Sequence, residues 1–184
     1  NDIADAPNHL VRIYVIDAAL AHGEWYPRWL SDLYLGYGYP LLNYYAPAMY
    51  YLAAALHGLG MTVYASFQWT GALCVAIGVV GTYALATTLT GRRDAALLAA
   101  LVFALSPYPF LTNLYIRAAV PEALALALLP WLLLATWRCW HRGGLWCAGV
   151  ALLVATLLLS HNISALLGVA LVAAWLLVLL VSAR

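Results

Sequence analysis

Charge is the property that this sequence has least of. Charged side chains make up 8% of the 184 residues, and hydrophobic side chains make up 66%. A soluble globular domain carries roughly a quarter charged residues, so this composition excludes that class. It predicts an integral membrane protein whose immediate partner is membrane lipid. The net charge of +1 leaves no excess of basic side chains for a nucleic acid, and no such partner is expected.

Lysine is absent, and cysteine is scarce. All eight basic residues are arginine, and the three cysteines are Cys74, Cys139 and Cys147. Cys74 falls within an apolar run, whereas the other two flank a turn assigned below to the cytoplasm, where thiols normally stay reduced. We therefore expect no disulfide and no zinc site. Asp5 and His9, four residues apart, could supply two ligands to a divalent metal, but two are too few to predict a metal or any other cofactor.

Long apolar runs fill most of the chain after residue 61. A hydrocarbon core of roughly 30 Å needs about 20 apolar residues in a helix. The last run is nearly twice that length and is interrupted only at Ser160, His161 and Asn162, so it predicts two helices. The sequence thus predicts an all-α polytopic transmembrane bundle over residues 62–184, with about five spans at 62–90, 95–111, 122–138, 145–160 and 163–182.

The arginines give this bundle an orientation. Basic residues lie between the first two spans, between the third and fourth, and after the fifth: Arg92 and Arg93, Arg138 and Arg142, and Arg184. The positive-inside rule assigns these three places to the cytoplasm. Residues 1–61, the loop at 106–122 and the break at His161 are then outside the cytoplasmic membrane, with six of the seven carboxylates. A chain that starts outside implies an upstream span or a removed leader, so we expect a fragment of a longer protein.

The external segment, residues 1–61, has its own helix signals. Asp5 and Pro7 predict a helix start, with Asp5 as a possible cap, and the helix should run over residues 6–22 and end at Gly23. Asp5, His9 and Arg12 share one face of it, because they recur at i, i+4 and i+7. After a loop rich in Tyr, Gly and Pro, an apolar helix over 48–59 is too short to cross a bilayer and should lie in the interface.

Several of these residues together resemble a known pattern. They resemble the bacterial polytopic membrane proteins catalogued as "6-pyruvoyl-tetrahydropterin synthase related", a label unrelated to pterin chemistry here. The matching positions run through nearly the whole chain: Asp5, His9, Leu10 and Arg12; Tyr26 with Trp29; Gly36 with Pro40; Tyr44, Tyr45 and Pro47; Tyr50 and Tyr51; Asn113, Tyr115 and Arg117; Pro121 and Glu122; and Ser160, His161 and Asn162.

That family is in turn similar to the GT-C glycosyltransferases. The resemblance implies a multi-pass enzyme that moves a sugar from a polyprenyl-phosphate donor outside the bacterial inner membrane. In such enzymes a large first external loop carries an essential Asp and interfacial helices. The sequence departs from that pattern, since neither the first GT-C span nor the distal soluble portion of longer relatives is present. Glycosyltransferase activity is therefore an expectation carried by the resemblance.

Asp5 is the candidate catalytic base. A carboxylate beside an acceptor hydroxyl can take its proton, and an arginine can neutralise the departing phosphate. This assigns Arg117, and secondarily Arg12, to the donor phosphate, with His9 supporting the Asp5 face. Each has an alternative: Asp5 could be a plain helix cap, and Glu122, a further candidate substrate contact, could simply offset a helix dipole or pair with Arg117.

Ser160, His161 and Asn162 interrupt an apolar run where polar groups are costly. His161 and Asn162 are candidate substrate contacts that face the same external cavity as Asp5 and Arg117. The alternative is that Ser160 or Asn162 merely caps the last span.

Two other functional classes compete with sugar transfer. One is a structural or accessory subunit that packs onto neighbouring subunits of a larger respiratory or photosynthetic membrane complex; Gly71, Gly78 and Gly81 would suit close helix packing in either case. The other is a transporter, which is less favoured because no mid-span charge marks a pathway. An enzyme requires Asp5, Arg117 and His161 around one water-accessible cavity, whereas a scaffold does not.

Overall fold

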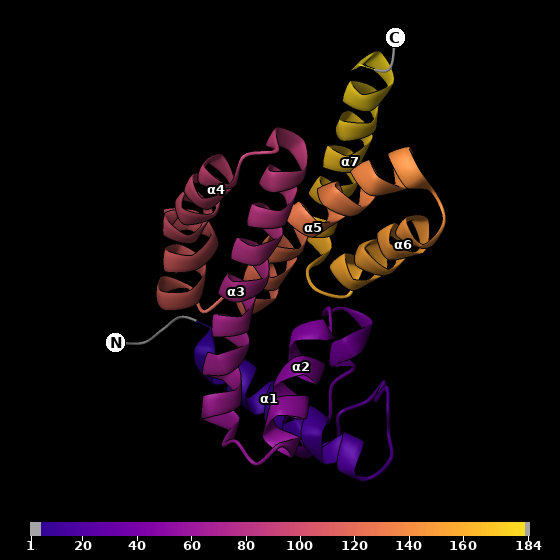
Figure 1. The fold of residues 1–184 in the computed structure, drawn as a ribbon. Coiled ribbons are helices and arrows are strands. Elements are labelled where there is room, and N and C mark those ends of the chain that lie inside the picture. Colours follow the sequence, from indigo (N-terminus) through magenta and orange to yellow (C-terminus); the bar gives the residue numbers. More distant parts are fainter. Residues whose placement is uncertain (1–4, 183–184) are drawn as a thin grey trace.

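The computed structural model of the chain describes residues 5–182 and is built from helices (Figure 1). Within that range no β-strand forms, and the one isolated bridge joins Leu30 and Tyr39. The predicted all-α class is confirmed. Arg184 lies outside the described residues. The helices are α1 Ala6–Ala21, α2 Ala48–Gly58, α3 Val63–Thr90, α4 Arg93–Leu105, the π-helix η3 Pro107–Ile116, α5 Val120–Arg142, α6 Leu145–Leu158 and α7 Asn162–Ser182, with short 3-10 turns at Tyr34–Gly36 and Leu41–Asn43.

Four helical stretches are long and apolar enough to cross a membrane: Val63–Thr90, Arg93–Ile116, Val120–Arg142 and Asn162–Ser182. The second joins α4 and η3. The stretch expected as a further span forms α6, which has 14 residues and measures about 21 Å, less than the roughly 30 Å of a hydrocarbon core. The structure therefore contains a polytopic helical bundle with four candidate spans and one shorter apolar helix.

Helix α5 is the centre of this bundle. It packs against α3, α6 and α7, and α3 also packs against α4. In the apolar window of α5, 72% of residues are buried, compared with 17–22% in the other three candidate spans. Those three helices accordingly expose apolar side chains that a bilayer would cover.

The glycines of α3 face its neighbours inside the bundle. A Cβ at Gly78 would overlap the ring of Phe103, and one at Gly81 would lie 2.6 Å from the indole of Trp131. The indole of Trp131 donates a hydrogen bond to the carbonyl oxygen of Ile77, at 2.8 Å. Gly78 and Gly81 thus pack against helices of this chain, and they do not indicate a contact with a helix of another subunit.

The segment before α3 forms a second layer beneath the bundle (Figure 1). Helices α1 and α2 pack on each other and on α3, with Ile13, Ile16 and Met49 fully buried between them. At the entry to α3, the side chain of Thr62 accepts a hydrogen bond from the backbone of Ala65, at 3.1 Å. The layer also meets the α6–α7 turn, because the backbone N–H of Ala48 donates to the carbonyl of Leu159, at 2.8 Å.

The prediction that the chain forms no disulfide is wrong, because Cys139 and Cys147 are bonded. Between them, Gly143 and Gly144 have φ values of 62° and 60° with ψ near the extended range, a combination that glycine alone adopts readily. This turn reverses the chain between α5 and α6 and brings the two Cα atoms to 4.9 Å. The prediction of reduced thiols used only the cytoplasmic assignment of this turn, which says nothing about the distance between the two cysteines. Cys74 is buried and free.

Candidate functional site

Arg117 is the hub of a hydrogen-bonded group at the junction of η3 and α5. Its Nη1 donates to Asn113 Oδ1 at 2.9 Å, to Glu122 Oε2 at 2.9 Å and to the Tyr108 hydroxyl at 3.4 Å. The Tyr108 hydroxyl in turn donates to Glu122 Oε1, at 2.6 Å. We call Tyr108, Asn113, Arg117 and Glu122 the Arg117 network. The expected pairing of Arg117 with Glu122 is present, and Glu122 also lies in the first turn of α5.

The backbone around this network has an unusual conformation. Residues 107–116 form a π-helix, a rare geometry that is frequent at functional sites. Ala118 then has φ 56°, a left-handed value that costs a residue with a Cβ about 1 kcal/mol. The turn is closed by the backbone N–H of Ala119, which donates to the carbonyl of Asn113, at 2.6 Å. The π-helix and the turn together bring Asn113, Arg117 and Glu122 into contact.

The network leaves donors unused. The side chain of Arg117 is 45% exposed and that of Glu122 is 11% exposed, so the pair spans the edge of the protein. Within residues 5–182, the Nε and Nη2 atoms of Arg117 make no hydrogen bond. Asn113 is fully buried, and its Nδ2 has no partner in the described part of the chain. The exposed guanidinium of Arg117 can therefore donate to an anionic or carbonyl-bearing ligand, whereas the Asn113 amide is enclosed by the protein.

A second group surrounds His9 on α1. The Nδ1 atom of His9 lies 2.9 Å from the Tyr50 hydroxyl, which also accepts from Arg12 Nη1 at 3.2 Å. The Arg12 guanidinium lies 4.4 Å from the centre of the Tyr45 ring, and Phe67 stacks on the His9 ring with centroids 5.9 Å apart. We call His9, Arg12, Tyr45, Tyr50 and Phe67 the His9 cluster. Through these contacts His9 and Arg12 hold α1 against α2, and His9 also packs against α3.

Burial lowers the pKa of His9 to about 4, and the nearby Arg12 adds to this effect, while Asp5 opposes it. His9 is thus neutral at pH 7, and its Nδ1 can accept the proton of the Tyr50 hydroxyl. Asp5 lies at the N-cap position of α1 and is exposed, but its side chain makes no capping hydrogen bond. Asp5 therefore does not cap α1 through its side chain, as the alternative interpretation expected.

His161 lies in the turn between α6 and α7, beside a cleft of about 190 Å³. The cleft is lined by Tyr44, Tyr45, Ala46, Ser160, His161, Asn162 and Ile163, and we call it the His161 cleft. His161 Nδ1 lies 2.9 Å from Ser164 Oγ and accepts from the Ser164 backbone, at 3.4 Å. His161, rather than Ser160 or Asn162, thus caps the start of α7. The Ser160 hydroxyl instead donates back to the carbonyl of Thr156, at 2.6 Å.

Neither the His161 cleft nor the α3 groove described below is lined by Asp5, Arg117 and His161 together, so the shared cavity expected of an enzyme is not observed there. Burial lowers the pKa of His161; the negative charge of Glu122 opposes this effect and the positive charge of Arg117 adds to it. Tyr45 connects this region to Arg12, since it lines the His161 cleft and carries the guanidinium on its ring. Neither Asp5 nor Arg117 lines the His161 cleft itself.

An apolar groove of about 230 Å³ lies on α3, and its lining includes sequence neighbours of Asp5 and Arg117. Its walls come from α3, η3 and the starts of α1 and α5, and the lining residues are Ala6, Tyr64, Phe67, Gln68, Gly71, Ala72, Val75, Leu114, Tyr115 and Val120. Ala6 follows Asp5 directly, and Tyr115 precedes Arg117 by two residues. We call it the α3 groove. Its lining contains no charged residue and comes mainly from candidate membrane spans.

Sequence reasoning missed Tyr108, Tyr45 and Tyr50 as members of these groups. A signal was present for Asn113, because it precedes Arg117 by four residues in a mainly apolar segment. Tyr45 and Tyr50 were marked by their place in the family pattern, but nothing in the sequence indicated their partners, which are distant along the chain; Tyr108 carried no signal, because its partners lie across an irregular turn. Among the described residues, no group of three His, Cys, Asp or Glu side chains is arranged to hold a metal ion.

Comparison with known proteins places the chain in a family. No curated protein and no solved structure matches it. Residues 42–184 match the family described as "6-pyruvoyl-tetrahydropterin synthase related domain; membrane protein". The match includes the Arg117 network, the His161 cleft and all four candidate spans, and it starts after α1. Because the match covers most of the chain, this protein belongs to the 6-pyruvoyl-tetrahydropterin synthase related family of membrane proteins.

Proposed function

We propose that this membrane protein binds a lipid-linked sugar phosphate at the external membrane face and transfers its sugar, as GT-C glycosyltransferases do. The observation that carries the proposal is the unused donor capacity of Arg117, which follows Tyr115, a lining residue of the α3 groove, by two residues. The groove is apolar and is walled by helices suited to a bilayer, while the guanidinium retains free donors. Such a combination fits an amphipathic ligand with an isoprenoid chain and a phosphate, namely a polyprenyl-phosphate sugar.

In the proposed reaction, Arg117 stabilises the leaving group. The acceptor oxygen forms a bond to the anomeric carbon as the bond from that carbon to the phosphate oxygen breaks, and negative charge collects on the phosphate. The Nε and Nη2 donors of Arg117 can take up that charge without prior rearrangement, because Glu122 and Asn113 already hold Nη1. No metal is required by this scheme.

Asp5 is the proposed base. It would accept the proton of the acceptor hydroxyl as the new glycosidic bond forms. Asp5 is exposed and directly precedes Ala6, a lining residue of the α3 groove. In this scheme Arg12 does not bind the phosphate, because its guanidinium is engaged by Tyr50 and Tyr45. His9 and Arg12 are positioning residues that fix α1, and therefore Asp5, against α3.

His161 and Asn162 are proposed to bind the sugar. The His161 cleft is lined by the polar residues Ser160, His161 and Asn162 and by the aromatic residues Tyr44 and Tyr45. Sugars are bound by just such hydrogen-bonding and aromatic side chains. The external location of all these groups rests on the arginine distribution and is part of the proposal.

The test is sugar transfer in proteoliposomes that contain the full chain, with a panel of polyprenyl-phosphate-linked radiolabelled hexoses and pentoses. Replacing Arg117 with Gln removes the charge, and we expect a loss of about 100-fold or more in turnover, in the range of an oxyanion-type contact. Arg117→Lys should retain part of the activity. Arg138→Gln, a matched arginine far from the groove, should change little. Equal turnover in Arg117→Gln and Arg138→Gln would contradict the proposal.

A further inference from the structure

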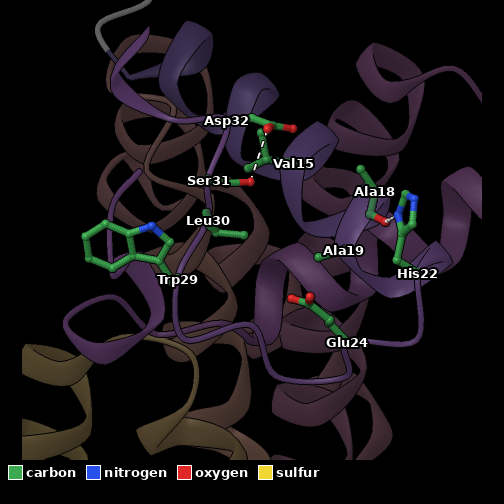
Figure 2. Close-up of a pocket in the computed structure, with 9 residues that line it drawn as sticks. All are labelled: Val15, Ala18, Ala19, His22, Glu24, Trp29, Leu30, Ser31 and Asp32. Carbon is green, nitrogen blue, oxygen red and sulfur yellow. Dashed lines mark hydrogen bonds between the residues drawn. The ribbon is translucent and has the colours of Figure 1, made fainter. Parts of the chain in front are cut away.

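A second cleft, of about 510 Å³, lies on α1, away from the α3 groove and the His161 cleft (Figure 2). Its lining comes from the C-terminal half of α1 and from the irregular loop that follows: Val15, Ala18, Ala19, His22, Glu24, Trp29, Leu30, Ser31 and Asp32. We call it the α1 cleft. Its volume is within the range of roughly 300–1,000 Å³ that is usual for small-molecule sites.

The floor of the α1 cleft is apolar. Val15, Ala18 and Ala19 come from the helix, and the buried Leu30 comes from the loop. The two alanines leave the hollow, since a larger side chain at either position would fill it. The loop is fixed in place, because the Leu30 backbone exchanges hydrogen bonds with Tyr39 at 3.0 and 3.1 Å, and the Glu24 N–H donates to the Ala19 carbonyl at 3.0 Å.

The polar groups lie at the two ends of this floor. Figure 2 shows Asp32 at one end and Glu24 at the other, with Leu30 and Ala19 between them. Ser31 donates to Asp32 Oδ1 at 3.2 Å, and His22 Nδ1 donates to the Ala18 carbonyl at 2.8 Å. Within residues 5–182, neither Glu24 nor Asp32 forms a salt bridge. Because ionised carboxylates only accept hydrogen bonds, a ligand must bring donors to both ends.

We propose that the α1 cleft binds a saccharide. A single metal ion does not fit, since His22, Glu24 and Asp32 do not form a three-ligand group in the described structure. A short sugar chain does fit, because it presents hydroxyl donors at both ends and an apolar C–H face to the floor. Trp29 adds an exposed indole at the edge, where it packs so closely over Gly38 that a Cβ on that glycine would overlap the indole nitrogen.

Saccharide binding in this cleft does not depend on sugar transfer; its role as an acceptor subsite rests on the proposed function. Along the axis of α1, the cleft is about 20 Å from Asp5, given a rise of about 1.5 Å per residue. A saccharide in the cleft would therefore be a distal part of the acceptor, and the reacting hydroxyl would lie several sugar units away. In the transfer reaction, the cleft would therefore determine which acceptor saccharides bind.

The test measures binding by the full chain in lipid nanodiscs, without any donor. The probes are maltotetraose, cellotetraose and chitotetraose, followed by saturation-transfer NMR and calorimetry. We expect at least one to bind, and Ala19→Trp, which fills the floor, to weaken it about 10-fold or more. The double variant Glu24→Gln/Asp32→Asn changes only exposed side chains and should weaken it similarly. Asp94→Asn, a carboxylate remote from the cleft, and Arg117→Gln should leave binding unchanged.

Three outcomes would overturn the inference: no probe binds, binding is unaffected by both cleft variants, or spermidine or calcium binds in place of sugars and is lost with the carboxylates. Circular dichroism and thermal melting of each variant exclude misfolding. Failure of this inference is separable from failure of the proposed function. Saccharide binding without any transfer contradicts the proposed function and leaves the cleft as a binding site. Transfer that is insensitive to the cleft variants contradicts only the role of the cleft as an acceptor subsite.

Discussion

Arg117 is restrained through one of its nitrogens and free at the others, and this asymmetry explains why it differs from the other arginines. Arg92 pairs with the adjacent Asp94 on the surface, and Arg138 lies over the ring of Trp146 at 4.4 Å. Arg117 instead holds a carboxylate that is nearly buried. Removing Arg117 would leave the nearly buried Glu122 carboxylate without a compensating positive charge, and an unpaired buried charge destabilises the folded protein.

Replacing Glu122 with Gln tests how much the Arg117–Glu122 pair stabilises the folded protein. The variant loses the charge-assisted bonds from Arg117 and Tyr108, and we expect the free energy of unfolding to fall by about 1–3 kcal/mol. Denaturant or thermal unfolding in detergent micelles measures the change. Asp32→Asn, at an exposed carboxylate with no ion pair among the described residues, should stay within about 0.5 kcal/mol. Equal effects of the two substitutions would show that the pairing contributes no stability.

His9 makes the folding stability of the protein depend on pH, and the sign of this dependence follows from its lowered pKa. Its pKa is about 4 in the folded chain and 6.5 as an ordinary value, so the unfolded chain binds the extra proton first. Stability from this residue is complete above pH 6.5 and is lost as the pH falls from 6.5 to 4, by up to about 3 kcal/mol. The melting temperature measured from about pH 7.5 to about pH 4.5 should therefore fall more steeply in the native protein than in His9→Gln. His141→Gln, at an exposed histidine, should follow the native curve.

Among the elements, apolar runs and capping signals predicted most of the helices. The start of α1 was predicted from Asp5 and Pro7, and α2, α3 and α5 were predicted from apolar runs; in the structure Thr62 caps α3, and Pro7 and Pro121 lie in the first turns of α1 and α5. The π-helix was not predictable, because its wide turns depend on Asn113 meeting Arg117 and the Ala118 turn. Nor was the disulfide, which depends on how tightly two glycines reverse the chain. Distant pairs such as His9 with Tyr50 require the packing of α1 on α2.

The interface of α3 with α5 allows a test in which two similar substitutions have opposite effects. Gly81→Ala places a methyl group against Trp131, which is held by its bond to Ile77, and overpacking of this kind costs about 1–3 kcal/mol. Gly149→Ala, in α6, meets no atom within 4 Å and should stabilise the helix by up to about 1 kcal/mol. Thermal melting of both variants decides; a stabilised Gly81→Ala would mean that α3 and α5 pack less closely than described.

The turn between α5 and α6 depends on its disulfide. Cys139 and Cys147 are eight positions apart in the sequence, and closing such a loop stabilises the folded chain by about 2–3 kcal/mol in the chain-entropy account. We expect reduction with dithiothreitol to lower the melting temperature of the isolated protein. The double variant Cys139→Ser/Cys147→Ser should melt at the reduced value with or without the reagent. A melting temperature that is insensitive to reduction in the native protein would mean that the bond adds no stability.

For the whole molecule, the orientation in the membrane determines which compartment the site can serve. In Figure 1 the α3–α4 turn and the end of α7 lie towards one side, and α1 and α2 lie towards the other. From the arginines at 92, 93, 138 and 142 we predict that the first side faces the cytoplasm. The disulfide lies in one of these arginine-bearing turns, whereas disulfides persist in oxidising compartments. The predicted orientation and the disulfide therefore oppose each other, and a measurement of the orientation decides between them.

Single cysteines in a background of Cys74→Ala, Cys139→Ser and Cys147→Ser test the orientation. Tyr37→Cys lies in the loop before α2, where Tyr37 is 84% exposed, and Arg93→Cys lies at the opposite end of the bundle. A membrane-impermeant maleimide added to intact spheroplasts should label the first and reach the second only after permeabilisation. The reverse pattern would place the disulfide in the oxidising compartment and Asp5, Arg117 and His161 in the cytoplasm. Sugar transfer from an external polyprenyl-phosphate donor would then be impossible at this site, whatever its geometry.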